Sequence, residues 1–573
     1  MKQILQFLRP HIKQMIVVMV LYALQSVCAL FMPYIMSDIV EIGIRNADMP
    51  FIVKQGVVMI VLAVSALVCA LVNNRVSSDM ICKLTTDMRR AVFNKVNSLD
   101  FEQFNEIGTG SLITRSTDDI GWMEEVFGMV PYILVSAPIL FVGGIILSFK
   151  GDWVLPLILL GVSAVVLLIV ILMTSRLEGL WQRGDEFTDI QNRVVRERLT
   201  GIRVVRAFDK EDYEHQRAKK ATIEMCNSFV RANTISGLVN PIASLLLNAT
   251  TAVIIYIGAV RVQSVDSLLA GDIIATIQYI ALIVNAILTF SWTISFIPHV
   301  KVSMRRISAV LQLESKRSYE HLNVQLDGQI QFEKVSFSYA QSQVNVVDNA
   351  TVQADQGQIV GIIGGTGSGK TTLLKLIMDY YPTKSGKRYF GGIDYDQLTP
   401  PTIRDNISVA LQKPMIFEGT IADNIRVGNP LATEEQITQA LQIAQLGPFI
   451  EENADGINYA VTQAGTNISG GQKQRISIAR AILRDASVYI FDDSFSALDY
   501  LTESNLRKAL NKYLQGKTQI IVTQRAATAM RCDKVYVMEN GKIVGCGTHK
   551  QLLESCQTYK EIYQSQLGGG LDE

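Results

Sequence analysis

The chain has 573 residues, which exceeds the size of one hydrophobic core and predicts several domains unless part of the chain lies in a membrane. Charged residues make up 18% of the sequence, the mean hydropathy is +0.23, and apolar residues concentrate in the first half. Lysine plus arginine and aspartate plus glutamate are equal at 53 each, so the overall charge shows no signature of a nucleic-acid-binding protein. The seven cysteines are scattered without paired spacing, which argues against a disulfide framework or a metal site.

Six apolar segments are candidates for membrane-spanning helices, each of which takes about 20 residues. The second segment is short by hydropathy, and we expect it to extend through polar residues that neighbouring helices shield. The predicted cores of the spans are residues 15–35, 57–72, 130–149, 153–173, 238–260 and 273–300.

Basic residues divide unevenly between the connections. Segments 73–129 and 174–237 are rich in lysine and arginine, whereas connections 37–54, 150–152 and 261–272 are short and poor in them. Cytoplasmic connections carry the excess of positive charge. Both termini and the two long connections are therefore predicted to be cytoplasmic. A soluble protein with six core helices is the alternative, and it would not explain this asymmetry.

The two long connections keep apolar residues at helical spacing, so we expect the spanning helices to continue beyond the membrane and to reverse at short transverse helices. Candidate bends are residues 109–115 and 208–213. After Lys301 the sequence becomes typical of a soluble protein. The predicted domains are a transmembrane domain of residues 1–301, a linker of residues 302–328 and an α/β domain of residues 329–573, whose motifs are described next.

A glycine-rich segment follows the apolar run of residues 359–363, which is typical of a buried strand, and precedes a helical pattern. Its spacing, G-x-x-x-x-G-K-[ST], is that of a phosphate-binding loop, in which backbone N–H groups and a helix N-terminus bind phosphates. Lys370 would supply a positive charge to the phosphates, and the Thr371 hydroxyl would ligate Mg²⁺. The predicted ATP-binding residues of this segment are Gly364, Gly365, Thr366, Gly367, Ser368, Gly369, Lys370, Thr371 and Thr372.

Two further motifs follow the phosphate-binding loop. Residues 488–491 form an apolar strand pattern that ends in Asp492 and Asp493, and a carboxylate at the end of such a strand can hold Mg²⁺. Residues 468–472, Ile-Ser-Gly-Gly-Gln, precede a helix. A Ser-Gly-Gly-Gln run alone is a weak signal. Its position between the phosphate-binding loop and the aspartate strand makes it much more specific.

Together with residues 496–499, Ser-Ala-Leu-Asp, these motifs resemble the ATPase domain of ABC transporters. The six spans and two long connections are similar to a half-transporter of the multidrug exporter type, and residues 197–208 are similar to that family's second cytoplasmic connection. The resemblance covers almost the whole chain. It implies an α-helical six-span transmembrane domain with long cytoplasmic extensions, followed by an α/β P-loop ABC nucleotide-binding domain that uses ATP and Mg²⁺.

The resemblance also implies roles for single residues. Tyr339 matches the position at which an aromatic ring stacks on adenine, although an ordinary strand tyrosine would look the same in sequence. Gln412 matches a glutamine that contacts Mg²⁺ or its water. Two ATPase domains meet head to tail in this family, so a chain with one such domain must pair with a second half-transporter. The predicted metal ligands are Thr371, Gln412 and Asp492, and the predicted contacts to the partner's ATP are Ser469, Gly470, Gly471 and Gln472.

Two positions depart from the pattern of the family. Members that hydrolyse ATP carry a glutamate directly after the Mg²⁺-binding aspartate, where this chain has Asp493. The family's switch histidine aligns with Gln524, which cannot act as an acid. Loss of a general base typically costs on the order of 10²- to 10⁴-fold. The chain therefore resembles the degenerate-site subunit of a bacterial heterodimeric exporter, whose partner carries the glutamate and the histidine. A homodimer would have two impaired sites.

The sequence is least informative about the substrate. Uncharged polar and aromatic span residues suit amphipathic, hydrophobic molecules, although helix-packing amides and interfacial aromatics look identical in sequence. We predict multidrug-type export through the bacterial cell membrane, with membrane lipid as a further partner. The alternatives are a lipid or lipopeptide flippase and an ATP-binding regulatory or channel subunit that does not pump. The candidate cavity residues are Tyr22, Gln25, Asn248, Tyr279, Asn285, Phe290, Trp292 and Phe296.

Overall fold

The chain divides into two compact units in a computed structural model, which describes residues 6–149, 153–262, 270–294, 296–313, 324–339, 342 and 344–567. The helical unit comprises Met1–Leu99 and Ile107–Glu314, and the α/β unit comprises Asp100–Glu106 and Ser315–Glu573. The second unit thus takes a short piece of the first long connection.

The helical unit is built from long helices, because its apolar runs contain few residues that interrupt helical hydrogen bonding. Among the described residues, six helices are long and apolar enough to cross a membrane: Gln6–Ile44, Met49–Asn97, Thr109–Ser148, Val154–Thr200, Glu211–Arg261 and Ala270–Thr293. The elements of this unit are η1 (Arg9–His11), α2 (Ile12–Asp38), η2 (Ile39–Ile44), α3 (Met49–Asn97), α5 (Thr109–Ser116), α6 (Asp118–Pro131), η3 (Tyr132–Ser136), α7 (Ala137–Ser148), α8 (Val154–Thr200), α9 (Ile202–Ala207), α10 (Glu211–Val262), α11 (Ala270–Ile294) and α12 (Ile297–Leu311).

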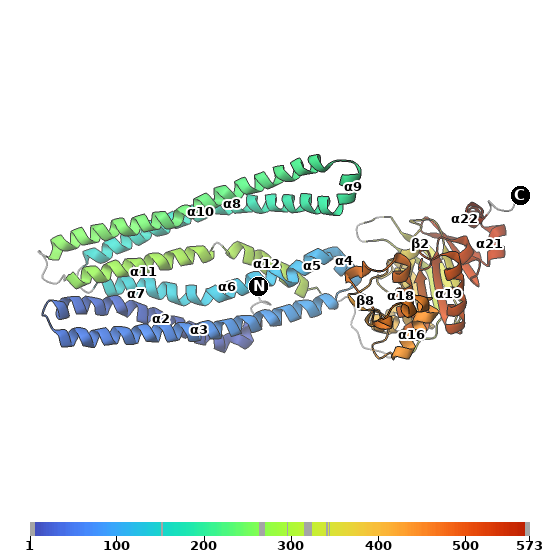
Figure 1. Cartoon of the computed structure of the whole chain (residues 1–573), viewed down its shortest axis with the longest axis horizontal. Coiled ribbons are helices and arrows are strands. Elements are labelled where there is room, and N and C mark those ends of the chain that lie inside the picture. The colour runs from blue at the N-terminus through green and yellow to red at the C-terminus, as the bar shows by residue number, and fades with distance from the viewer. Residues whose placement is uncertain are drawn as a thin grey trace. The chain divides into compact units, whose positions relative to one another are not determined.

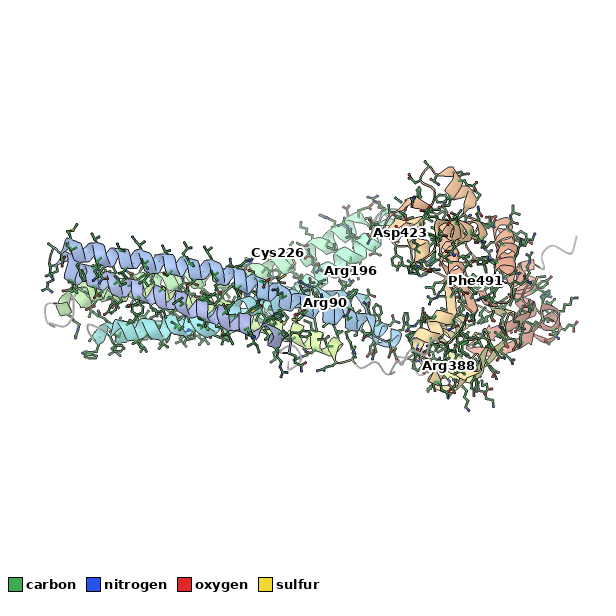
Figure 2. All side chains as sticks on the ribbon, turned by 90° about the horizontal axis from the view of Figure 1, so that it is seen from below. Arg90, Arg196, Cys226, Arg388, Asp423 and Phe491 are labelled. Atoms are coloured by element: carbon green, nitrogen blue, oxygen red, sulfur yellow. The ribbon has the colours of Figure 1, made fainter. Side chains whose placement is uncertain are left out.

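Helices α8 and α10 lie side by side, and the short helix α9 joins them at one end (Figure 1). Cys226 and Arg196, both labelled in Figure 2, lie on these two helices. Two large apolar clusters and a smaller one around Leu155 and Ile254 stabilise the described part of this unit. One large cluster includes Leu159 and Ile283 and joins α2, α7, α8, α10 and α11, and the other large cluster includes Leu84 and Ile307 and joins α3, α6 and α12.

The structure corrects the first predicted bend and bears out part of the second. Residues 109–115 belong to helix α5, and the short helix that precedes it is α4 (Phe101–Ile107). Residues 208–213 cover the whole turn between the short helix α9 and α10, and the start of α10. Gly108 has a φ of +81°, a left-handed conformation that glycine adopts at no steric cost, so it separates α4 from α5.

The sixth predicted span is also shorter than expected. Helix α11 ends at Ile294, and α12 begins at Ile297, so the segment predicted as continuous to Val300 is interrupted. A proline in the first turn of α12 suits a helix start, where its missing N–H is not needed. Part of the predicted linker, residues 302–311, is helical and belongs to the helical unit, while residues 314–323 lie outside the described part of the chain.

The α/β unit consists of three sheets covered by helices. A six-stranded sheet has the order β12-β11-β3-β10-β9-β6, a four-stranded sheet has the order β2-β1-β4-β5, and β7 pairs with β8. The strands are β1 (Ile330–Phe337), β2 (Val347–Ala354), β3 (Ile359–Ile363), β4 (Ser385–Phe390), β5 (Ile393–Asp394), β6 (Ile407–Ala410), β7 (Gly419–Thr420), β8 (Ala460–Val461), β9 (Val488–Asp492), β10 (Thr518–Thr523), β11 (Lys534–Glu539) and β12 (Lys542–Gly547).

The helices of this unit connect the strands and cover the sheets. They are α4 (Phe101–Ile107), α13 (Lys370–Ile377), η4 (Tyr395–Gln397), α14 (Pro400–Asn406), α15 (Ile421–Arg426), α16 (Glu434–Ile443), α17 (Gly447–Glu452), η5 (Gly456–Asn458), η6 (Gln463–Gly465), α18 (Gly470–Leu483), α19 (Tyr500–Tyr513), α20 (Ala526–Ala529), α21 (His549–Ser555) and α22 (Gln557–Leu567). The two units confirm the predicted fold class, a six-span helical domain followed by an α/β domain.

The parallel centre of the large sheet positions the site. Strands β3, β10 and β9 are neighbours, with Thr523 opposite Ile363 and Val522 opposite Asp492. Their side chains are almost all buried, as Phe491 on β9 is (Figure 2). Since parallel strands end at the same edge of a sheet, the residues that follow Ile363, Asp492 and Thr523 lie close together although they are far apart in sequence.

Helix α4 attaches to the α/β unit through aromatic rings. The Phe101 ring stacks on Tyr380 with centroids 4.8 Å apart and meets Tyr381 edge to face at 5.7 Å. The Asn105 side-chain amide donates a hydrogen bond of 3.0 Å to the Tyr381 hydroxyl. These contacts explain why this short helix, which the first long connection supplies, belongs to the second unit.

Candidate nucleotide-binding site

The glycine-rich segment joins β3 to α13, as its flanking patterns predict. Gly369 precedes the helix with a φ of +102°, a conformation that a side chain would strain. A Cβ on Gly364 would lie 2.2 Å from the Met538 carbonyl oxygen, so only glycine fits there without a shift of the backbone. With glycine at these two positions, the segment can turn tightly into the start of α13. The first backbone N–H groups of a helix have no partner within it and can bind an anion.

Lys370 is buried beneath this loop. Its ammonium donates hydrogen bonds to the carbonyl oxygens of Gly364 and Gly365, at 2.8 and 2.6 Å, and to the Ser368 hydroxyl at 3.3 Å. Burial lowers the pKa of Lys370, and the nearby carboxylates of Asp493 and Asp492 oppose that shift. The structure therefore holds a cation at the place where the phosphates are predicted to bind.

The predicted Mg²⁺ ligands come from three elements. The Thr371 hydroxyl, at the start of α13, lies 3.5 Å from the carboxylate of Asp492 at the end of β9. Asp492 is buried, and this burial, followed by the charge of Asp493, raises its pKa. Gln412 follows β6 and is exposed. Hydroxyl, carboxylate and amide oxygens are ligands that suit Mg²⁺, which would screen the phosphate charge when bound.

Tyr339 follows β1 at the edge of an aromatic cluster. Its ring meets Phe337 and Tyr381 edge to face, with centroids 5.0 and 5.4 Å apart. Its hydroxyl lies 3.1 Å from the Thr372 hydroxyl, within hydrogen-bond distance. Sequence reasoning named both Tyr339 and Thr372 as ATP-binding residues without predicting this contact, which ties the predicted adenine residue to the helix of the phosphate-binding loop.

Asp493 and Gln524 lie at the carboxyl edge of neighbouring strands. Asp493 has a φ of +46°, and its N–H donates to the Val522 carbonyl at 2.9 Å. Burial raises the pKa of Asp493, while a hydrogen bond from Gln412 and the charges of Arg525 and Lys370 act in the opposite direction. Gln524 is exposed, and its carbonyl accepts a hydrogen bond of 2.7 Å from the Gln566 side chain. The fold thus places the two residues that we predicted to depart from the family pattern at the ends of neighbouring strands.

Residues 468–472, Ile-Ser-Gly-Gly-Gln, which we call the signature segment, lead into helix α18. Ser469 caps the helix, because its hydroxyl accepts from the Gln472 N–H at 3.3 Å while the Gln472 side chain accepts from the Ser469 N–H at 2.7 Å. Ser469 and Gly470 are exposed, and a Cβ on Gly470 would meet no atom within 4 Å. Gly471 lies against the loop after β9, since its Cβ would be 3.3 Å from the Ala497 carbonyl oxygen.

Sequence reasoning missed two residues at this site. Arg525 donates to the Ser496 carbonyl at 2.7 Å, and the Ser496 hydroxyl donates to the Asp493 carbonyl at 2.8 Å. Both residues stand beside predicted ones in the sequence, Arg525 after Gln524 and Ser496 in the Ser-Ala-Leu-Asp motif. Adjacency is the signal that could have found them, but only the fold shows that they meet.

The α/β unit contains a phosphate-binding loop, a strand that ends in carboxylates and a glycine-rich helix start. The other unit has, among the described residues, six helices long and apolar enough to cross a membrane. Together these features define a membrane-associated ATP-binding protein. Residues 15–287 match the family described as the ABC transporter transmembrane region, and residues 347–496 match the family described as ABC transporter. The chain belongs to the ABC transporter family.

Bacterial relatives match over nearly the whole chain. An uncharacterized ABC transporter ATP-binding protein of Mycobacterium tuberculosis is 32% identical over 98% of this chain and 97% of its own length. The uncharacterized ABC transporter ATP-binding protein YfiB of Bacillus subtilis is 31% identical over 99% of both chains. The ATP-dependent lipid A-core flippase of Chromohalobacter salexigens is 27% identical over 99% of this chain and 98% of its own.

A solved structure supports the fold. A bacterial Atm1-family ABC exporter with ATP bound superimposes with a TM-score of 0.82 and 19% sequence identity, over 98% of each chain. The chain therefore has the fold of an ABC exporter half-transporter, with a transmembrane domain and an ABC ATP-binding domain in one polypeptide.

Proposed function

We propose that this chain is one subunit of a heterodimeric ATP-driven exporter of amphipathic, hydrophobic compounds. Its own site binds ATP with Mg²⁺ and hydrolyses it slowly. Its signature residues, Ser469 to Gln472, complete the hydrolytic site of a second half-transporter that carries the glutamate and the histidine. Closure of the two ATP-binding domains turns the cavity between the membrane halves outward, and hydrolysis at the partner's site resets it.

The observation that carries this proposal is the contrast within the ATP site. The residues that hold phosphate are complete, with Lys370 buried under its loop and Thr371 beside Asp492. The two positions that act on the γ-phosphate hold Asp493 and Gln524. An aspartate is one methylene shorter than a glutamate, and a base must come within about 2.6–3.2 Å of the proton that it takes. From this combination we expect a site that binds ATP and hydrolyses it slowly.

The exposed signature supports pairing. Ser469 and Gly470 are exposed at the start of a helix of 14 residues, and a Cβ on Gly470 would meet no atom of the described part of the chain within 4 Å. A helix start with free space around it suits contact with the γ-phosphate of an ATP molecule held by another chain.

The substrate class rests on the membrane helices. Asn248 on α10 and Asn285 on α11 are exposed although both lie in spanning segments, and Trp292 on α11 is exposed as well. Uncharged amides are costly against lipid, so such residues favour a surface that faces a cavity or a partner. Tyr279 does not fit this group, since it is buried and its hydroxyl donates to the Leu30 carbonyl at 3.2 Å.

The proposed location is the bacterial cell membrane, with both termini and the ATP-binding domain in the cytoplasm. A lipid or lipopeptide flippase is a second candidate, which the similarity to an ATP-dependent lipid A-core flippase favours. Stimulation of the ATPase activity of the pair separates the two candidates. A stronger response to amphipathic drugs supports the exporter, and a stronger response to lipid analogues supports the flippase. A regulatory or channel subunit would not support transport against a gradient.

The central experiment compares ATP hydrolysis by the purified chain with hydrolysis by the chain together with the half-transporter encoded beside it. We expect little hydrolysis by the chain alone and robust hydrolysis by the pair. Robust hydrolysis by the isolated chain would overturn the proposal. In the pair, Asp493→Glu combined with Gln524→His should raise turnover at this chain's site and shorten the time for which nucleotide stays bound.

A further inference from the structure

Arg525 connects three segments at the γ-phosphate end of the ATP site. It follows Gln524 directly in sequence, and its guanidinium has two separate partners. One nitrogen donates to the Glu503 carboxylate in α19 at 2.8 Å, and another donates to the Ser496 carbonyl at 2.7 Å. A planar guanidinium with two such bonds fixes both distance and angle between its partners.

Glu503 gives Arg525 a rigid anchor. Its side chain is 9% exposed, whereas that of Arg525 is 40% exposed. Besides Arg525, the Glu503 carboxylate accepts hydrogen bonds from Arg507 and, at 2.9 Å, from the Thr528 hydroxyl. Because donors from α19, from α20 and from the residue before α20 meet on one buried carboxylate, that carboxylate has little freedom to move.

Ser496, which accepts a hydrogen bond from Arg525, is itself hydrogen-bonded to Asp493. The Asp493 carbonyl accepts from the Ser496 N–H at 3.3 Å and from its hydroxyl at 2.8 Å, so the two residues form one tight turn. At its other end the same loop is held by Asp499, which caps α19 by accepting from the Thr502 N–H at 3.0 Å. Arg525 therefore bonds to the turn that carries Asp493 while standing next to Gln524 on the backbone.

We propose that Arg525 is a positioning residue for the γ-phosphate: it holds the turn of Asp493 at a fixed distance from Gln524, with Glu503 as its anchor. This inference rests on the proposed function, because it assigns Asp493 and Gln524 to the γ-phosphate. The phosphate-binding loop and Tyr339 lie on other elements and do not contact Arg525 through any hydrogen bond among the described residues. Loss of Arg525 should therefore lower the affinity of the chain for ATP and leave its affinity for ADP unchanged.

The test measures the affinities of the full-length chain, in detergent or nanodiscs, for fluorescent ATP and ADP analogues with Mg²⁺. We expect Arg525→Met to weaken ATP binding about tenfold, since charge-assisted hydrogen bonds are lost, and to leave ADP binding unchanged. Arg525→Lys keeps the charge but cannot bond both partners in the same geometry, so it should give a smaller loss for ATP. Glu503→Gln should lower the ratio of ATP affinity to ADP affinity, as Arg525→Met does.

Lys508→Met is the control, because Lys508 is an exposed cation on α19, the helix that carries Glu503, and its loss should leave both affinities unchanged. A melting temperature for each variant reports on folding. Equal losses for ATP and ADP, or no loss for either, would overturn the inference. That outcome is distinct from failure of the proposed function, which shows as strong hydrolysis by the isolated chain whatever residue stands at position 525.

Discussion

The phosphate-binding loop and the signature segment are both glycine-rich helix starts in one α/β unit, yet their surroundings differ. The base of the loop is enclosed by its own chain, with Lys370 buried and Gly364 against the Met538 carbonyl, while Gly365, Thr366 and Gly367 at its tip are exposed. The signature begins with the exposed residues Ser469 and Gly470, and no atom of the described residues would meet a Cβ on Gly470 within 4 Å. The loop therefore holds a buried cation of its own chain below an open tip, whereas the signature has only an exposed helix start, to which we propose that a second molecule binds.

The largest expected effect is at Lys370. In Lys370→Ala the buried cation is lost, and we expect ATP affinity of the full-length chain to fall about 100-fold, since hydrogen bonds to charged groups contribute strongly. Fluorescence titration with a labelled ATP analogue measures the effect. Lys387→Ala, on the exposed face of β4, is the control and should bind ATP normally. Normal ATP binding by Lys370→Ala would contradict the assignment of the loop.

The next effect tests how tightly the loop is enclosed. Gly364→Ala places a methyl group 2.2 Å from the Met538 carbonyl oxygen, so the backbone must shift. We expect the α/β unit to lose about 2 kcal/mol of stability, as overpacked positions do, and ATP binding to weaken in parallel. Thermal unfolding with and without ATP checks both. An unchanged melting temperature would show that the loop is looser than the structure indicates.

The same substitution in the signature should behave differently. Gly470→Ala meets no atom of its own chain within 4 Å, so stability and ATP binding by the isolated chain should not change. In the proposed pair the added methyl would displace the partner's γ-phosphate, and we expect hydrolysis to fall about tenfold. Steady-state ATPase activity of the pair measures this, with Gly447→Ala as the control. An unchanged rate would argue against a role for Gly470 at the partner's site.

The smallest expected effect concerns Tyr339, which contacts the helix that follows the phosphate-binding loop. Tyr339→Phe removes the hydroxyl that lies 3.1 Å from Thr372 and keeps the ring. We expect ATP affinity to fall about threefold, which corresponds to one neutral hydrogen bond. Tyr339→Leu, which removes the ring, should cost more if that ring stacks on adenine. Equal affinities for the two variants would remove the stacking role from Tyr339.

Local patterns explain what was predicted well. Each spanning helix corresponds to a continuous run of apolar residues. The phosphate-binding loop, the strand before Asp492 and the helix after Ser469 are likewise each contiguous in sequence. The first bend was misplaced for a related reason. Apolar spacing continues through short helices, so the pattern does not show where the chain reverses, and Gly108 is one residue among many candidates.

By itself, the sequence determined the six spans and the order of the ATP-binding motifs, and it led to the prediction that Asp493 and Gln524 replace two catalytic residues, because all of these depend on neighbouring residues. Only the tertiary structure decided that α4 packs on Tyr380 and that Arg525 bonds to Ser496 and Glu503. Such contacts join positions far apart in sequence. They form because parallel strands end at one edge of a sheet, a consequence of strand order that no single segment contains.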